Sequence, residues 1–137
     1  MKSIIIDANI ILRYLLADNS EFFEKSKVLF DKALNNELEI LIKEIVITEV
    51  VYVLEKFYKV ERKQIAEILT SLILLRGIKI ENRNYILEAF KIYKNKKLDF
   101  VDCVLCSMSK DYKIETFDKK LNNCINNKEA REGWKLQ

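Results

Sequence analysis

The chain contains 137 residues, of which 50% are hydrophobic and 33% are charged. This composition excludes a disordered chain and predicts a single helix-rich globular domain spanning residues 1–137. The 24 basic and 21 acidic residues nearly balance, so charge alone neither requires nor excludes a nucleic-acid partner. The absence of histidine excludes Ser-His-Asp and Cys-His catalysis. If the protein is an enzyme, carboxylates or a bound metal must therefore carry its chemistry.

The apolar runs are too short for a membrane span, and the N-terminus lacks the apolar core of a secretory signal. Three cysteines, an odd number, favour the reducing cytoplasm over an oxidising compartment. A structural zinc site is excluded because it needs four cysteine or histidine ligands. The pair Cys103-x-x-Cys106 falls inside a predicted helix, so we expect both residues to be buried packing thiols.

The first predicted element is a strand at residues 3–6, an all-apolar run typical of a strand buried on both faces of a parallel sheet. Asp7 follows directly, and a helical pattern begins at about Asn9. Because a lone buried carboxylate is costly, we expect Asp7 to have a partner, a metal or access to solvent. In open α/β sheets the carboxyl edge of the strands binds ligands. The alternative is that Asp7 only caps the helix that follows.

The rest of the chain alternates between predicted helices and strands. Helices are predicted at about 20–35, 45–58, 61–75, 82–93 and 99–113, and strands at 39–42, 78–80 and 113–117, with a weak terminal strand at 134–136. The polar stretch at 121–128 is predicted to be a loop or a frayed end. This alternation indicates the α/β fold class, with a mainly parallel sheet covered by helices on both sides.

Several carboxylates occupy positions that are unusual for isolated charges. Glu49 is the only charge in the first two turns of the predicted helix at 45–58, which is apolar nearly all round. We therefore expect Glu49 to be buried, with a buried salt bridge as the alternative explanation. Asp99 and Asp102 share one face of a helix's first turn, where they could also act as caps. Asp118 follows the predicted strand at 113–117 and could also be a turn residue.

Asp7, Glu49, Asp102 and Asp118 can all face the same edge of the predicted sheet. Carboxylates packed closely raise one another's pKa unless a cation neutralises them. Oxygen ligands without histidine or thiolate suit Mg²⁺ or Mn²⁺, ions that orient and activate water near a phosphodiester. A lysine cluster before Asp99 could hold a phosphate backbone, although such a run is more often a solvated helix face. Its members are Lys91, Lys94, Lys96 and Lys97.

Four short motifs follow one another along the chain. They are Asp7-x-Asn9 followed by Leu12-Arg13-Tyr14-Leu15-Leu16, then Thr48-Glu49-Val50-Val51-Tyr52-Val53-Leu54, then Asp99-Phe100-Val101-Asp102, then Thr116-Phe117-Asp118-Lys119. In order and approximate spacing they resemble the PIN domain family, and most of all the VapC-type toxins of bacterial and archaeal toxin-antitoxin pairs. The resemblance covers residues 3 to about 120.

The resemblance implies a three-layer α/β/α sandwich and an endoribonuclease that depends on Mg²⁺ or Mn²⁺. It also implies a homodimer that cleaves RNA and is inhibited by a small antitoxin protein. The metal-binding and catalytic acids would be Asp7, Glu49, Asp102 and Asp118. Asp99 would be an additional acid, Asn9 and Thr116 would be polar supports near the metal, and Arg13 would contact substrate or antitoxin.

Two residues depart from the family pattern. Ala8 stands where serine or threonine is common, and Cys103 stands where a smaller residue is usual. Two other functions remain open: a PIN nuclease of RNA or DNA processing outside any toxin pair, and a non-catalytic module that binds Mg²⁺ for regulation. A receiver domain is disfavoured because the first strand ends in one acid rather than a pair. A DxD phosphatase is disfavoured because Asn9 occupies the place of the second acid.

Overall fold

The computed structural model describes residues 2–127, and the predicted terminal strand at 134–136 lies outside them. Within this range one parallel sheet contains β1 (Lys2–Ile5), β2 (Leu38–Ile42) and β3 (Ile78–Ile80), in that order. Ile40 in β2 pairs with Ile4 of β1 and with Ile78 of β3, so the middle strand contributes the centre of the sheet. The predicted parallel sheet is confirmed.

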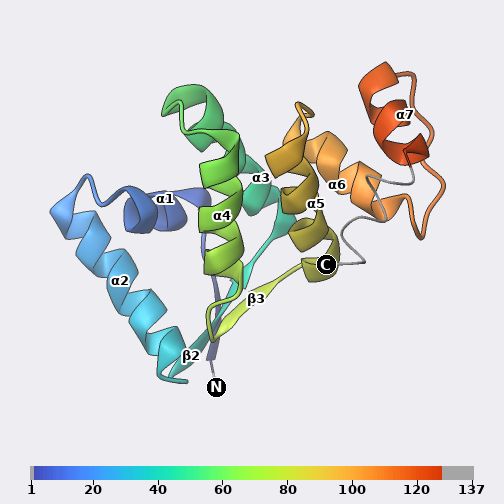
Figure 1. Cartoon of the computed structure of the whole chain (residues 1–137). Coiled ribbons are helices and arrows are strands. Elements are labelled where there is room, and N and C mark those ends of the chain that lie inside the picture. Colours follow the sequence, from blue (N-terminus) through green and yellow to red (C-terminus); the bar gives the residue numbers. More distant parts are fainter. Residues whose placement is uncertain (1, 128–137) are drawn as a thin grey trace.

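Helices pack around this sheet (Figure 1). Within the described range they are α1 (Ala8–Leu16), α2 (Ser20–Leu34), α3 (Glu44–Tyr52), the π-helical turn η1 (Val53–Phe57), α4 (Arg62–Ile73), α5 (Arg83–Asn95), α6 (Phe100–Met108) and α7 (Lys119–Asn126). α2 contacts β2 and α4 contacts β3, while α6 packs on α5 and carries α7 on its other side. The α/β fold class is therefore confirmed. No helix in residues 2–127 combines the length and apolar character needed to cross a membrane.

β1 is more exposed than expected. It lies at the edge of the sheet with β2 as its neighbour, and Ile5 is 65% exposed. Ile6, just beyond the strand, is buried and joins the core. The expectation of a strand buried on both faces is wrong, because a short run of isoleucines predicts a strand without predicting its place in the sheet.

The predicted strand at 113–117 does not form. These residues pair with no other described strand, and the side chain of Phe117 is fully exposed. A strand is stable only when its main chain pairs with a neighbour, and this segment instead connects α6 to α7 as an extended loop.

The polar stretch after Asp118 is a helix rather than the predicted loop. Residues 119–126 form α7, which buries Leu121 and Cys124 on one face. These two residues stand three positions apart, so they lie on the same side of the helix. Asn122 and Asn123, which stand between them, make the stretch look uniformly polar in the sequence, so the amphipathic pattern was missed.

The predicted helix at 45–58 is confirmed as α3 followed by η1, but its predicted burial is wrong on one side. Ile47 and Val50 are buried, whereas Ile45 is 76% exposed and Tyr52 is 65% exposed. Glu49 lies on this open side and is exposed. The helix looked fully buried because large apolar residues occupy its solvent-facing positions as well as its core-facing ones.

Candidate active site

Asp99, Asp102 and Asp118 line one pocket of about 340 Å³, which we call the acidic pocket. α6 positions two of these residues, Asp99 as its N-cap residue and Asp102 in its first turn. Asp118 is the N-cap residue of α7. The lining is completed by Lys97, Leu98, Lys119 and Lys120. The structure therefore brings together three of the predicted acids from two separate helices.

The charges of the acidic pocket act on one another. Burial raises the pKa of the Asp102 carboxyl above its usual value, and the negative charges of Asp118 and Asp99 raise it further. Such a group of like charges is unfavourable unless a proton or a cation neutralises it. A cation close to these carboxylates would therefore favour the ionised form of Asp102.

Arg62 in α4 holds the turn that precedes α6. Its Nη2 donates to the carbonyl oxygen of Lys96 at 2.7 Å and also to that of Leu98, and its Nε donates to the carbonyl of Tyr93 at 3.2 Å. The guanidinium lies 3.7 Å from the centre of the Tyr93 ring and forms a 3.0 Å ion pair with Glu55. Arg62 thus fixes the main chain from which Asp99 and Asp102 extend. No sequence pattern marks it, because its partners are remote main-chain carbonyls.

Glu55 completes the support of Arg62. Burial raises the pKa of the Glu55 carboxyl, but a hydrogen bond from the Tyr93 hydroxyl, together with the charges of Lys56 and Arg62, lowers the pKa below its usual value on balance. Glu55 is therefore ionised at neutral pH and holds the guanidinium in place.

Cys103 packs beneath the same turn. Its thiol donates to the carbonyl oxygen of Leu98 at 3.4 Å, and its side chain is fully buried. Burial raises the pKa of this thiol to about 12, so it stays protonated at neutral pH. The departure from the family pattern at Cys103 thus places a buried thiol, rather than a smaller residue, directly behind Asp102.

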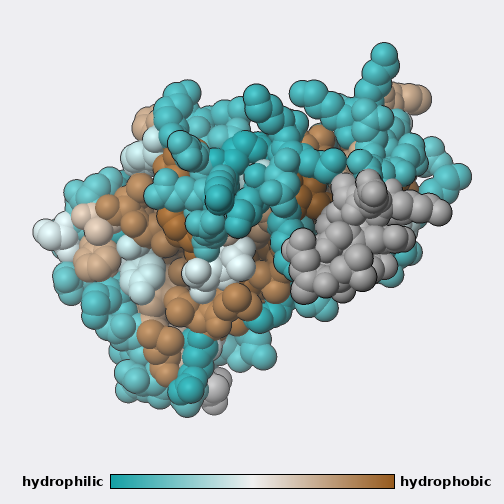
Figure 2. All heavy atoms as spheres, viewed as in Figure 1, coloured by the Kyte–Doolittle hydropathy of each residue, from teal (hydrophilic) through white to brown (hydrophobic). Residues whose placement is uncertain are grey.

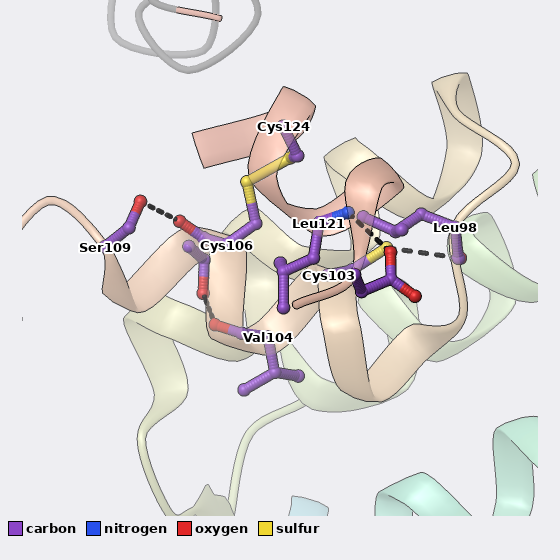
Figure 3. Close-up of a disulfide and its surroundings, with 9 residues drawn as sticks. Leu98, Cys103, Val104, Cys106, Ser109, Leu121 and Cys124 are labelled. Carbon is purple, nitrogen blue, oxygen red and sulfur yellow. Dashed lines mark hydrogen bonds between the residues drawn. A yellow bond between two sulfur atoms is a disulfide. The ribbon is translucent and has the colours of Figure 1, made fainter. Parts of the chain in front are cut away.

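A disulfide joins the two helices that supply the acids. Cys106 of α6 is bonded to Cys124 of α7, and Figure 3 shows the bond bridging the helices beside Leu121. The expectation of buried packing thiols is therefore correct for Cys103 and wrong for Cys106, because the approach of α7 to α6 was not foreseen. The cysteine count no longer supports the expected reducing compartment.

The turn before α7 is held by local hydrogen bonds. The Thr116 hydroxyl accepts from the main-chain N–H of Asp118 at 3.0 Å, and the Thr116 carbonyl accepts from the side-chain amide of Asn122 at 3.1 Å. Asp118 Oδ1 accepts from the N–H of Leu121 at 2.9 Å. These bonds fix the main chain on both sides of Asp118.

Asp7 lines a different pocket, of about 350 Å³, which it shares with the other predicted residues of the first motif, Asn9 and Arg13. Asp7 is the N-cap residue of α1, and its Oδ1 accepts from the N–H of Ile10 at 3.1 Å. The capping role that competed with a ligand role is therefore observed. Arg13 is engaged in a 2.9 Å ion pair with Asp18.

Glu49 lines neither of these two pockets. Its exposure excludes the buried salt bridge that was the alternative explanation for a charge on α3. The predicted acids thus fall into three places: Asp99, Asp102 and Asp118 in the acidic pocket, Asp7 in the second pocket, and Glu49 on the open side of α3.

The donor chemistry of the acidic pocket fits a hard divalent cation, since all its acidic ligands are carboxylate oxygens and their mutual repulsion favours neutralisation. The spacing does not yet fit, because no group of three or more acidic or cysteine side chains in the described part of the chain lies close enough to hold a metal ion. The pocket is therefore an acidic cluster rather than a formed coordination site.

Comparison with known proteins identifies the family. A family model described as PIN domain matches residues 4–124, so the chain belongs to the PIN domain family, and the resemblance seen in the four motifs is confirmed. A relative named VapC ribonuclease, from Aquifex aeolicus (strain VF5), is 29% identical over 100 residues, which cover 73% of this chain and 73% of the relative. No solved structure matches the chain at a significant level.

Proposed function

We propose that this protein is an endoribonuclease that depends on Mg²⁺ or Mn²⁺ and cleaves RNA phosphodiester bonds at the acidic pocket. The observation that carries the proposal is the convergence of Asp99, Asp102 and Asp118 on one pocket in a chain of the PIN domain family. The name of the Aquifex aeolicus relative, VapC ribonuclease, supports RNA as the substrate.

Asp102 and Asp118 are the residues we assign to hold the metal ion, with Asp99 as the additional acid. Asp7 and Glu49 are assigned to the same catalytic set; both side chains are exposed, although neither lines the acidic pocket. A bound divalent cation supplies a water of lowered pKa and stabilises negative charge on the phosphodiester. The carboxylates supply the negative charge that retains it.

Three further residues take supporting roles in this proposal. Thr116 fixes the turn that carries Asp118 through the hydrogen bonds described above. Asn9 lies next to Asp7 in the second pocket. Arg13 contacts RNA or an inhibitory protein there, and its present ion pair with Asp18 is about one-third exposed and so readily exchanged.

We also propose that the protein is the toxin of a toxin-antitoxin pair, acts as a homodimer and is inhibited by a small antitoxin. Support comes from the VapC name of the relative and from the surface. An apolar groove of about 380 Å³ lies between α1 and α4, lined chiefly by Tyr14, Leu15, Ile68, Leu72 and Leu75. Figure 2 shows apolar side chains gathered on the face between α2 and α4. Exposed apolar surface of this kind is typical of protein interfaces.

An RNA cleavage assay tests the proposed activity. Purified protein is incubated with total RNA and Mg²⁺ or Mn²⁺, and a parallel reaction contains EDTA. Cleavage is expected only with the metal and is expected to be lost in Asp102→Asn. The matched control is Asp31→Asn, which removes a carboxylate paired with Lys27 on α2, away from both pockets. Equal cleavage by wild type and Asp102→Asn, or no cleavage by wild type with either metal, contradicts the proposal.

A further inference from the structure

Three lysines line the acidic pocket together with its three carboxylates. Lys97, Lys119 and Lys120, which we call the lysine rim, are exposed. Several lysines elsewhere on the surface pair with neighbouring acids, for example Lys27 with Asp31 at 2.7 Å and Lys113 with Glu115 at 3.1 Å. No rim lysine forms such a pair with an acid in residues 2–127, even though carboxylates line the same pocket.

The rim lysines come from two segments that are held in fixed positions. Lys97 lies in the turn before α6, between Lys96 and Leu98, whose carbonyl groups accept hydrogen bonds from Arg62. Lys119 and Lys120 are the first two residues of α7, directly after the cap residue Asp118. The disulfide between Cys106 and Cys124 joins α6 to α7. The positive charges are therefore carried by an ordered framework rather than by a flexible tail.

Two members of the lysine cluster noted in the sequence, Lys94 and Lys97, have different surroundings in the structure. Lys94 forms a 3.2 Å ion pair with Glu67 on α4 and so faces away from the pocket. Lys97 lines the pocket and has no acidic partner in the described chain. Lys119 and Lys120 line the same pocket, although they lie outside this cluster, on the C-terminal side of Asp99 and Asp102 in the sequence. The alternative of a solvated helix face therefore holds for Lys94 but does not account for the rim.

We infer that the lysine rim binds the phosphate backbone of RNA on either side of the phosphodiester held at the acidic pocket. This inference rests on the proposed function, because it names the substrate contact of the same site. Lysine is an established point-charge ligand for phosphate, and exposed unpaired ammonium groups are free to exchange counterions for phosphates. The carboxylates between them repel a polyanion, so the rim supplies the attraction that brings RNA to the pocket.

The size of the effect follows from counterion release. Each phosphate that a protein neutralises on a single strand adds about 0.7 to the slope of log affinity against log salt concentration. Three phosphate contacts made by the rim lysines therefore add about 2 to the magnitude of that slope. Their loss at about 0.1 M salt corresponds to a weakening of RNA binding of about 100-fold.

The experiment compares two triple variants of equal charge. One carries Lys97→Gln, Lys119→Gln and Lys120→Gln. The control carries Lys→Gln at Lys32, Lys63 and Lys79, exposed positions on α2, α4 and β3. Each set of three substitutions lowers the formal charge of its parent by three, so the effect of total charge cancels in the comparison. Both are made in an Asp102→Asn background, so that the RNA probe survives the measurement.

Binding of a fluorescein-labelled single-stranded oligouridylate is measured by fluorescence anisotropy over a series of KCl concentrations. The rim variant is expected to lose about 2 from the salt slope and about 100-fold in affinity, while the control keeps the slope of its parent. Equal slopes in the rim variant and its parent, or equal losses in both triple variants, overturn the inference. If the triple variant does not fold, each single rim substitution is expected to lower the slope by about 0.7.

Cleavage by the otherwise wild-type protein separates the two proposals. Metal-dependent cleavage together with an unchanged slope in the rim variant overturns the lysine rim and leaves the nuclease standing. A rim-specific loss of slope without any cleavage supports the rim as an RNA-binding surface and removes the nuclease proposal.

Discussion

Asp102 in the first turn of α6 and Asp118 at the N-cap of α7 line the same pocket, and the charge of Asp118 contributes to the raised pKa of Asp102. A carboxyl whose pKa is raised in the folded state binds its proton more tightly there than in the unfolded chain. This group therefore favours folding below its usual pKa, and that benefit is lost as pH rises through the raised value. At neutral pH the ionised carboxylate costs stability.

Asp102→Asn is accordingly predicted to raise the thermal midpoint at pH 7, by roughly 2 °C for a change of a fraction of a kcal/mol in a chain of this size. RNA cleavage is predicted to be lost in the same variant, a trade of stability against activity that is common at functional sites. Calorimetric melting curves and cleavage assays check both effects. A lower midpoint in Asp102→Asn would show instead that this carboxylate stabilises the helix start.

Glu55 has the opposite pH dependence. Although burial raises its pKa, Tyr93, Lys56 and Arg62 lower it on balance, so the carboxyl releases its proton more readily in the folded state. The resulting stability is present above the usual pKa and is lost as pH falls through the lowered value. Glu55→Gln is predicted to cost about 1 to 3 kcal/mol at pH 7.

The stability difference between wild type and Glu55→Gln is predicted to shrink as pH falls below the usual value of 4.5. Thermal melts across this pH range measure it, with Glu37→Gln, an exposed acid in the turn before β2, as the control. A difference that stays constant with pH would show that packing, not ionisation, makes Glu55 important.

Arg62 is predicted to be a positioning residue for the acidic pocket. Arg62→Met removes the hydrogen bonds to Lys96 and Leu98, so the turn before Asp99 loses its anchor. We expect a loss of about 2 to 3 kcal/mol in unfolding free energy, since partly buried carbonyls lose a charged donor. Steady-state cleavage should show a lower kcat and a higher KM, because the turn that Arg62 anchors carries both the carboxylates and the RNA-binding Lys97.

Arg62→Lys provides the matched comparison. Lysine keeps the charge but cannot reach three carbonyls with a planar fork, so it is predicted to restore only part of kcat. Full restoration of kcat by lysine would mean that Arg62 contributes only its charge. A loss of activity that merely follows the fraction of unfolded protein would mean that Arg62 contributes only stability.

The disulfide between α6 and α7 is predicted to stabilise the fold. Its cysteines are separated by 18 residues, and closing a loop of this size contributes about 3 kcal/mol in the chain-entropy model. Dithiothreitol is therefore expected to lower the thermal midpoint of wild type, whereas Cys124→Ser should melt at a lower temperature and be insensitive to the reductant. Equal midpoints of wild type with and without reductant would contradict a disulfide in the folded protein.

Much of the fold follows from periodicity in the sequence. β2 and α4 each begin and end within two residues of their predicted bounds, because alternating or helically spaced apolar residues determine them locally. α7 was missed because its apolar face consists of few residues among many asparagines. The strand at 113–117 was predicted wrongly because strand formation depends on a remote partner, which no local pattern encodes.

Part of the candidate site was likewise predictable from local sequence patterns, and part was not. Asp99 and Asp102 were found because they stand at the start of a predicted helix, which is a local signal. Asp118 was chosen because it follows the predicted strand at 113–117, and it lines the same pocket although that strand does not form. The burial of Glu49 was predicted wrongly because a helix with apolar residues on its solvent side looks like a core helix. Arg62 and the pairing of Cys106 with Cys124 were missed, since both depend on contacts between distant segments.

The central claim, that the acidic pocket binds a divalent cation, is tested most directly by calorimetric titration of chelator-treated protein with MnCl₂. Wild type and Asp31→Asn are predicted to give the same saturable isotherm, and Asp102→Asn and Asp118→Asn are predicted to lose it. Absence of saturable binding in wild type, or an unchanged isotherm in both pocket variants, would contradict the claim.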